Sequence, residues 1–267
     1  MEVNIKEGID DTVNSKVQIF HEKTINGIAL FEKDKFPKFF GSGYDAAIFS
    51  IINCAFIVKN NLNGFFSLIE PFVEFNQEKK IYEIEDSKNK EFKKTLSNSN
   101  TLKDMEILEI TPIDADTSHL DFFNQMGANT SSLKVMDNGY ILNLQNFNSK
   151  INKEFDITFS NSLLHDNTSI EDDTHSNVYR SMELYAIFSN LTKKGGYSIH
   201  CHGNYISSLY ETYFQFLGLK VIDYFRIETG PYNFGIIMKK FNDKKISKEE
   251  FDYLYNELKK RNPIRYR

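Results

Sequence analysis

The sequence predicts an α/β fold in which a mostly parallel sheet is joined by crossover helices and closed by an antiparallel strand. From residue 105 onward, short apolar runs of strand length alternate with amphipathic stretches of helix length, an order typical of parallel strands joined by helices. The last two apolar runs, 219–228 and 233–241, are joined by the short segment TGPY. Gly and Pro in so short a joint favour an antiparallel pair, which we expect at a sheet edge.

The other elements follow from apolar periodicity along the chain. Strands are predicted at 105–110, 132–137, 155–160, 197–203, 219–228 and 233–241. Helices are predicted at 178–191, 204–218 and within 242–267. The sequence KKGG ends the first helix and Gly218 stops the second. In the last helix, Ser247 followed by Glu249 and Glu250 supplies the cap and the acids that a helix start favours.

The first hundred residues differ in texture from the rest of the chain. They mix helical periodicity with clusters of Phe and Tyr, and they end in the polar stretch 85–104. We therefore predict an α-rich N-terminal extension (1–100) and an α/β domain with a C-terminal helix (101–267). The extension is expected to form a lid or a homodimer surface, or simply an aromatic-rich core. Gly-Ser-Gly at 41–43 is either a phosphate-cradling turn or a plain turn.

Composition and charge bound the function. The chain has 267 residues, 40% hydrophobic and 26% charged, which predicts a folded globular protein. Its net charge of −5 gives no general field for a polyanion, so we expect no nucleic-acid binding. The longest apolar run, 46–58, is too short to span a bilayer. Cys54 and Cys201 stand apart without a disulfide or zinc pattern, which suits the cytoplasm.

Four segments carry a likeness to a known family. ILEITPIDA (107–115) is a strand ending in an acid before a turn, and SLKVMD (132–137) is a second strand ending in an acid. FDITFSNSLLHD (155–166) is an apolar strand with a polar end, and NLTKKGGYSIHCHG (190–203) is a helix end, a Gly-Gly turn and a strand. In this order they resemble the class I S-adenosylmethionine-dependent methyltransferases over about residues 105–241. The resemblance implies a Rossmann-like methyltransferase sheet and S-adenosylmethionine as cofactor.

The resemblance also implies a set of cofactor-binding residues at the strand ends. They are Glu109, Thr111, Pro112, Asp137, Ser160 and Asn161. Carboxylates suit the amino and hydroxyl groups of such a cofactor. Glu109 is alternatively an acid exposed at a sheet edge, and Asp137, followed by Asn and Gly, is alternatively turn chemistry. Ser160 and Asn161 are alternatively a local cap.

The first turn departs from the family pattern. The family usually places glycines there, because glycine adopts positive φ and lets the backbone approach the cofactor, whereas 111–115 contains none. Glu109-Ile110-Thr111-Pro112 is similar to the shorter Glu-Ile-Gly-Pro turn of some members. The compact segment from this turn to the strand at 155–160 predicts that one strand or helix of the usual set is abbreviated.

Three histidines are candidates for a catalytic base, because an imidazole titrates near neutrality. His165 follows the strand at 155–160, and His200 and His202 alternate on one face of the strand at 197–203. That pair has the geometry of two metal ligands, for which Asp166 or His175, like His165, is a possible third. The pair alternatively lines a substrate pocket or packs in the core, and we assign no metal.

These observations predict a methyltransferase that acts on a small hydroxylated molecule, such as a sugar of a surface polysaccharide. The alternative is a methyltransferase-like domain without catalytic activity that serves as a binding or scaffold protein. Motifs of serine hydrolases, phosphate-loop nucleotide hydrolases and zinc proteases are absent from the sequence.

Overall fold

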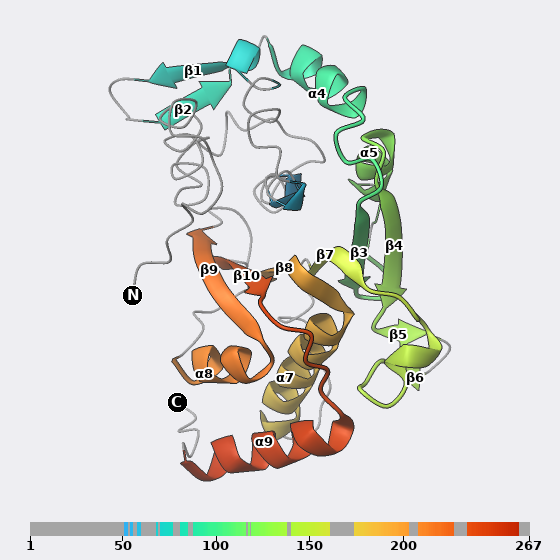
Figure 1. Cartoon of the computed structure of the whole chain (residues 1–267), viewed down its shortest axis with the longest axis vertical. Helices are drawn as coiled ribbons and strands as arrows, with labels where there is room; N and C mark the ends of the chain where they lie inside the picture. Colours follow the sequence, from blue (N-terminus) through green and yellow to red (C-terminus); the bar gives the residue numbers. More distant parts are fainter. Residues whose placement is uncertain are drawn as a thin grey trace.

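A computed structural model gives the fold of the chain (Figure 1). It describes residues 51–52, 54–55, 58–59, 68, 70–76, 81–84, 88–115, 117, 119–137, 140–160, 174–202, 208–226 and 234–261.

A six-stranded sheet with the strand order β4-β3-β7-β8-β10-β9 forms the centre of the described part. Its strands are β3 (Glu106–Thr111), β4 (Asn129–Lys134), β7 (Phe155–Ser160), β8 (Thr192–His202), β9 (Leu219–Arg226) and β10 (Phe234–Lys240). The pairs β3–β4, β3–β7 and β7–β8 are parallel, and β10 runs antiparallel to both β8 and β9. This order confirms the mostly parallel sheet, and β9 and β10 are the expected antiparallel pair at one edge.

The second expected strand lies earlier in the chain than predicted. β4 begins at Asn129 and ends at Lys134, whereas β5 (Met136–Asp137) pairs antiparallel with β6 (Tyr140–Ile141) in a separate hairpin. Because β4 is an edge strand, its polar residues tolerate exposure, and Leu133 is its one buried residue. Sequence periodicity therefore favoured the more apolar 132–137 over the true strand.

The two faces of the sheet bury separate hydrophobic clusters, because side chains alternate along each strand. Ile107, Ile157 and Ile199 face one cluster, shared with helices α4 (Asn89–Ser97) and α5 (His119–Gln125). Ile51, Ile52, Cys54, Ala55 and Phe72, from the N-terminal extension, also belong to this cluster. The extension further contains β1 (Val73–Asn76) and β2 (Ile81–Ile84), an antiparallel hairpin. The division near residue 100 stays a prediction, since residues on both sides of it share a core.

The opposite face of the sheet is covered by the three helices that the structure describes after β7. Leu108, Ile110 and Met238 pack there against residues of α7 (Thr174–Leu191), α8 (Ser208–Phe216) and α9 (Lys248–Arg261). The order of α7, β8, α8 and β9 is the predicted one. Gly218, with φ of 75°, follows the end of α8 as expected.

The connection from β4 to β7 is short. Among its described residues, 135–137 and 140–154, the only helical element is the single 3-10 turn η4 (Phe147–Ser149). The described part of this connection is therefore as compact as the sequence predicted.

The KKGG segment differs from its prediction, since it belongs to a strand. α7 ends at Leu191, and β8 starts at once with Thr192. The register to β7 shifts between Phe155 and Ile157, so the Lys-Lys-Gly-Gly residues form an irregular start of the strand. Gly195 has φ of 85°, a conformation that favours glycine.

The C-terminal helix has the predicted start. The amide of Glu250 donates to Oγ of Ser247 at 3.1 Å, and the amide of Ser247 donates to Oε2 of Glu250 at 3.0 Å. This is a reciprocal capping box. None of the described helices combines the length and the apolar character that a membrane crossing requires.

Candidate active site at the carboxyl edge of the sheet

The parallel strands bring their last residues to one edge of the sheet. Thr111 ends β3 opposite Lys134 of β4, and Ser160 ends β7 opposite His200 of β8. In open α/β sheets, ligands bind in the crevice outside this carboxyl edge. Side chains at these strand ends are therefore the ones placed to meet a ligand.

Glu109 is the buried acid of this edge. It is 1% exposed, and its Oε2 lies 3.1 Å from Nε2 of His119, the first residue of α5. The His119 ring packs edge-on against Phe159 with 5.8 Å between ring centroids. The alternative of an exposed acid is therefore wrong, because Glu109 lies between the sheet and α5.

Glu109 and Thr111 lie two positions apart, so their side chains fall on the same face of β3. Both are 1% exposed, and among the described residues neither Oε2 of Glu109 nor Oγ1 of Thr111 has an aligned hydrogen-bond partner. The Glu109–His119 contact is thus a close approach without an aligned hydrogen bond. A buried acceptor left in this state costs roughly 1–3 kcal/mol, which a ligand carrying N–H or O–H groups can offset.

The turn after β3 is fastened to its neighbours. The amide of Ala115 donates to the carbonyl of Pro112 at 3.2 Å, and Nζ of Lys134 donates to the carbonyl of Ala115 at 3.2 Å. Ile113 is 53% exposed at the tip. The last residue of β4 is therefore a cation, and Asp137 belongs to the β5–β6 hairpin, with its side chain outside the described part.

Ser160 and His200 form a buried polar group on the opposite face of the sheet. Nδ1 of His200 is 2.9 Å from Oγ of Ser160, and Nε2 is 2.7 Å from Oγ of Ser198. The imidazole is 0% exposed and lies edge-on to the rings of Tyr185 and Phe188. Both ring nitrogens of His200 are therefore engaged within the core. This supports the packing alternative for His200 and argues against its predicted catalytic role.

Several predicted site residues lie outside the described part. They are Asn161, His165 and Asp166. The side chains of His175 and His202 are also outside it, although their backbones belong to α7 and β8. In the described ranges, no three His, Cys, Asp or Glu side chains gather as a metal site.

The two cysteines are free and buried in the same hydrophobic cluster. Burial raises the pKa of the Cys201 thiol to about 12 and that of Cys54 as well. Thiols with raised pKa are poor nucleophiles, so neither cysteine is a catalytic candidate.

His119 and Lys134 were missed by sequence reasoning. His119 opens the first helix after the β3 turn, and βα units bring such a position against the preceding strand end. That topological rule was the available signal. For Lys134 there was none, because the strand itself was placed too late.

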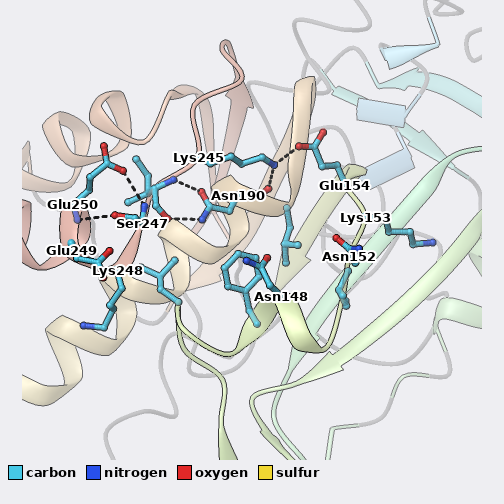
Figure 2. A pocket seen from close by; sticks show the side chains of 15 residues that line it. Asn148, Asn152, Lys153, Glu154, Asn190, Lys245, Ser247, Lys248, Glu249 and Glu250 are labelled. Atoms are coloured by element: carbon cyan, nitrogen blue, oxygen red, sulfur yellow. Dashed lines mark hydrogen bonds and ion pairs between the residues drawn. The ribbon is translucent and has the colours of Figure 1, made fainter.

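A cavity of about 640 Å³ lies at the opposite, amino edge of the sheet (Figure 2). At its rim, Lys245 pairs with Glu154 and donates to the carbonyl of Asn190. The side chain of Asn190 in turn hydrogen-bonds the backbone of Ile246. It lies away from the carboxyl edge, and these groups are already paired. We therefore place the candidate site at the carboxyl edge.

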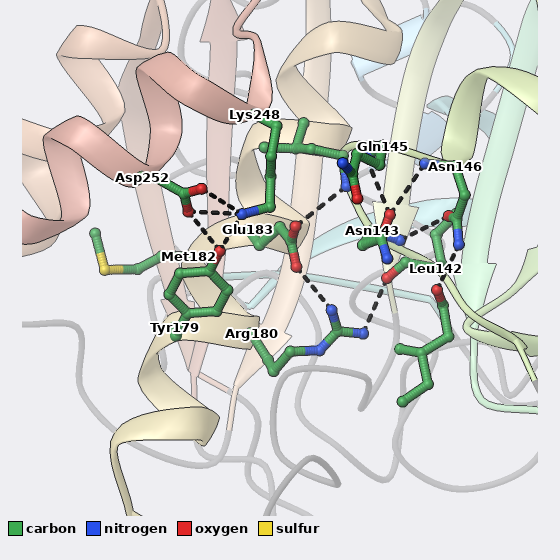
Figure 3. Close-up of polar contacts among 12 residues, drawn as sticks. Leu142, Asn143, Gln145, Asn146, Tyr179, Arg180, Met182, Glu183, Lys248 and Asp252 are labelled. Carbon is green, nitrogen blue, oxygen red and sulfur yellow. Dashed lines mark hydrogen bonds and ion pairs between the residues drawn. The ribbon is translucent and has the colours of Figure 1, made fainter.

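A polar network fixes the β4–β7 connection to α7 (Figure 3). Buried Glu183 accepts from the amide of Leu144 at 3.2 Å and from Nη1 of Arg180 at 2.7 Å. Nη2 of Arg180 donates to the carbonyl of Leu142 at 2.9 Å. The β4–β7 connection is thereby held against α7 by buried hydrogen bonds.

No protein-family model matches the sequence, and no curated protein matches it. Solved structures do. A 1,6-didemethyltoxoflavin-N1-methyltransferase of Burkholderia thailandensis, with bound 1,6-didemethyltoxoflavin and S-adenosylhomocysteine, has 9% identity and a TM-score of 0.37, covering 76% of this chain and 92% of that one. The N-methyltransferase NodS of Bradyrhizobium japonicum has 9% identity and a TM-score of 0.32, covering 59% and 99%. A putative ribosomal RNA methyltransferase of Plasmodium falciparum has 12% identity and a TM-score of 0.32, covering 52% and 87%.

The sheet has four neighbouring parallel strands, β4, β3, β7 and β8, and β10 is inserted antiparallel between β8 and β9. It matches the mostly parallel, Rossmann-like sheet with an antiparallel strand that the resemblance of residues 105–241 implied.

Proposed function

We propose that the chain is an S-adenosylmethionine-dependent methyltransferase that acts on a small hydroxylated molecule, such as a sugar of a surface polysaccharide. One observation carries the proposal: Glu109 and Thr111 hold buried oxygen atoms at the carboxyl end of β3, without aligned partners among the described residues. The amino and hydroxyl groups of S-adenosylmethionine are donors of the kind these atoms require. The net charge of −5 supports a small substrate over a polyanion.

In this proposal the chain supplies binding and alignment. Glu109 and Thr111 accept hydrogen bonds from the cofactor, Pro112 shapes the turn beside it, and Asp137 and Asn161 complete its site. When bound, the cofactor supplies an electrophilic methyl group. The contribution of the chain is to hold a substrate oxygen in line with that methyl group, which is mainly an effect of proximity.

A base must take the proton of the substrate hydroxyl. His165 and His202 remain the proposed candidates, whereas His200 is withdrawn because it is buried between Ser160 and Ser198. Ser160 is likewise withdrawn as a cofactor ligand, since its hydroxyl faces His200.

Calorimetric titration with S-adenosylmethionine and S-adenosylhomocysteine tests the proposal. β3 offers a matched control, because Glu106 lies at its other end, paired with Lys153 at 2.6 Å. We expect Glu109→Gln to weaken binding about tenfold or more, the loss of a charged hydrogen-bond partner, and Glu106→Gln to leave it unchanged. Absence of wild-type binding at millimolar cofactor would sink the enzyme proposal.

The second candidate is a methyltransferase-like binding or scaffold protein without activity. It is favoured by the glycine-free turn, which bonds to itself at Ala115 and is tethered by Lys134. The same titration separates the two candidates, because a scaffold has no need to retain cofactor affinity.

Partner and location assignments remain proposals. We propose a cytoplasmic protein that does not bind nucleic acid and that forms a homodimer or a lid through its N-terminal extension. Light scattering of the full chain measures the oligomeric state, and a gel-shift titration with RNA measures nucleic-acid binding. A mass of one chain would contradict the homodimer, and a salt-sensitive shift would contradict the exclusion of RNA.

A further inference from the structure

We propose that His119 is a positioning residue that holds the carboxylate of Glu109 in the orientation required for cofactor binding. The inference rests on the proposed function and deepens it, since it assigns a task to a residue outside the predicted site. It starts from the 3.1 Å contact between Nε2 of His119 and Oε2 of Glu109.

The two residues come from different elements and are both buried. Glu109 is 1% exposed near the end of β3, and His119 is 7% exposed at the first residue of α5. A buried carboxylate needs a compensating polar partner, because desolvation of its charge is costly. Within the described ranges, His119 is the residue at ion-pair distance from Glu109.

The imidazole is itself held in place, which a positioning role requires. Its ring packs edge-on against Phe159, with an interplanar angle of 65°. The helix that carries it is anchored by Phe123, which is fully buried and also lies edge-on to Phe159. The amide of Leu120 bonds the carbonyl of Thr117 and fixes the start of the helix. His119 therefore presents Nε2 from a rigid support.

The backbone conformation of the turn at 111–115 explains why a positioning side chain is needed. Residues with positive φ in the described part are Asn100, Asp104, Gly127, Gly195 and Gly218, and none lies in 111–115. The turn thus lacks the conformation by which a glycine-rich loop brings backbone amides close to a cofactor. Recognition at this strand end then falls to the side chains of Glu109 and Thr111, so the orientation of the carboxylate matters more than in a glycine-rich site.

Four single variants test the inference by calorimetry with S-adenosylhomocysteine. We expect His119→Leu to weaken binding about tenfold, because the carboxylate loses its support. His119→Gln should stay within about threefold of wild type, since the glutamine amide nitrogen reaches a place similar to Nε2. His119→Asn, which is shorter, should resemble leucine. Leu96→Ala, in α4 of the same hydrophobic cluster, controls for lost packing and should lower the melting temperature without changing affinity.

A double-mutant cycle gives a readout that a merely structural role would not produce. Once Glu109→Gln is present, adding His119→Leu should weaken binding by less than about twofold, because the residue acts through the carboxylate. Should His119→Leu fail to fold, the glutamine and asparagine variants carry the same comparison.

The outcomes separate the two claims. Absence of wild-type binding overturns the proposed function and this inference with it. If the wild type binds cofactor and His119→Leu binds it equally well, the inference about His119 is overturned and the proposed function stands. The same holds if the losses in the double-mutant cycle are additive. Rescue by glutamine together with non-additivity supports it.

Discussion

Nδ1 of His200 lies 2.9 Å from Oγ of Ser160, and this contact joins the ends of β7 and β8 inside the core. His200 is therefore predicted to stabilise the fold. His200→Leu leaves the hydroxyl of Ser160 buried without its partner and should lower the free energy of unfolding by about 2 kcal/mol or more. Urea denaturation measures this change.

The pair also predicts coupling. Ser160→Ala alone leaves an unsatisfied ring nitrogen, so the double variant Ser160→Ala/His200→Leu should cost less than the sum of the single changes. Cofactor affinity per folded molecule should be unchanged. A fully stable His200→Leu protein that has lost methyl transfer would restore the catalytic assignment.

Lys240 predicts a pH dependence of stability. Its Nζ is buried and donates to Oγ of Ser189 at 2.5 Å and to the carbonyls of Leu217 and Lys244, each at 2.8 Å. Burial, reinforced by the charge of Lys245, lowers the pKa of Lys240 from 10.5 to about 8. Between these values the unfolded chain binds the proton more tightly, so the free energy of unfolding should rise with pH and level off above 10.5.

The comparison with Lys240→Met isolates this effect from other titrating groups. The difference in unfolding free energy, wild type minus variant, should increase by about 2 kcal/mol between about pH 8 and about pH 10, because the variant lacks the buried ammonium. Lys239→Met, at the neighbouring position, serves as the control. A pH-independent difference for Lys240→Met contradicts the prediction.

The sheet was predictable because its strands bury alternating or continuous apolar residues, as in 155–160. β4 was misplaced because an edge strand needs little apolar surface, and its Asn129 to Ser132 carry none. KKGG was read as a break because glycine usually ends helices, whereas here it starts a strand irregularly.

The candidate site was predictable only in part. Glu109 follows from the rule that strand ends in a parallel sheet face the crevice. For His119 the βα rule brings the start of α5 near the end of β3, but the contact with Glu109 depends on how α5 packs on the sheet. Alternation in β8 correctly places His200 and His202 on one face of the strand. It cannot tell whether that face meets the crevice. In the structure, His200 faces Tyr185 and Phe188 of α7.

The capping box of α9 predicts a local loss of stability. Ser247→Ala removes the acceptor for the amide of Glu250 and should lower the free energy of unfolding by about 1 kcal/mol. Ser247→Asp keeps an acceptor and should stay near wild type. Glu249→Gln, an exposed change in the same turn, is the control for charge at the helix start. Equal stability of the alanine and aspartate variants contradicts a role for the cap.

Gly195 and Gly196 make a matched pair in the irregular start of β8. At Gly195, with φ of 85°, an added Cβ meets nothing within 4 Å, so Gly195→Ala should cost only the backbone strain, about 1 kcal/mol. At Gly196 an added Cβ would lie 2.5 Å from the carbonyl oxygen of Asp156 in β7, which forces the two strands apart. Gly196→Ala should therefore cost about 3 kcal/mol. Gly195→Asn should recover part of the first loss, because Asn tolerates positive φ. Chemical denaturation ranks the variants, and a Gly196→Ala protein as stable as Gly195→Ala would show that β7 and β8 do not approach this closely.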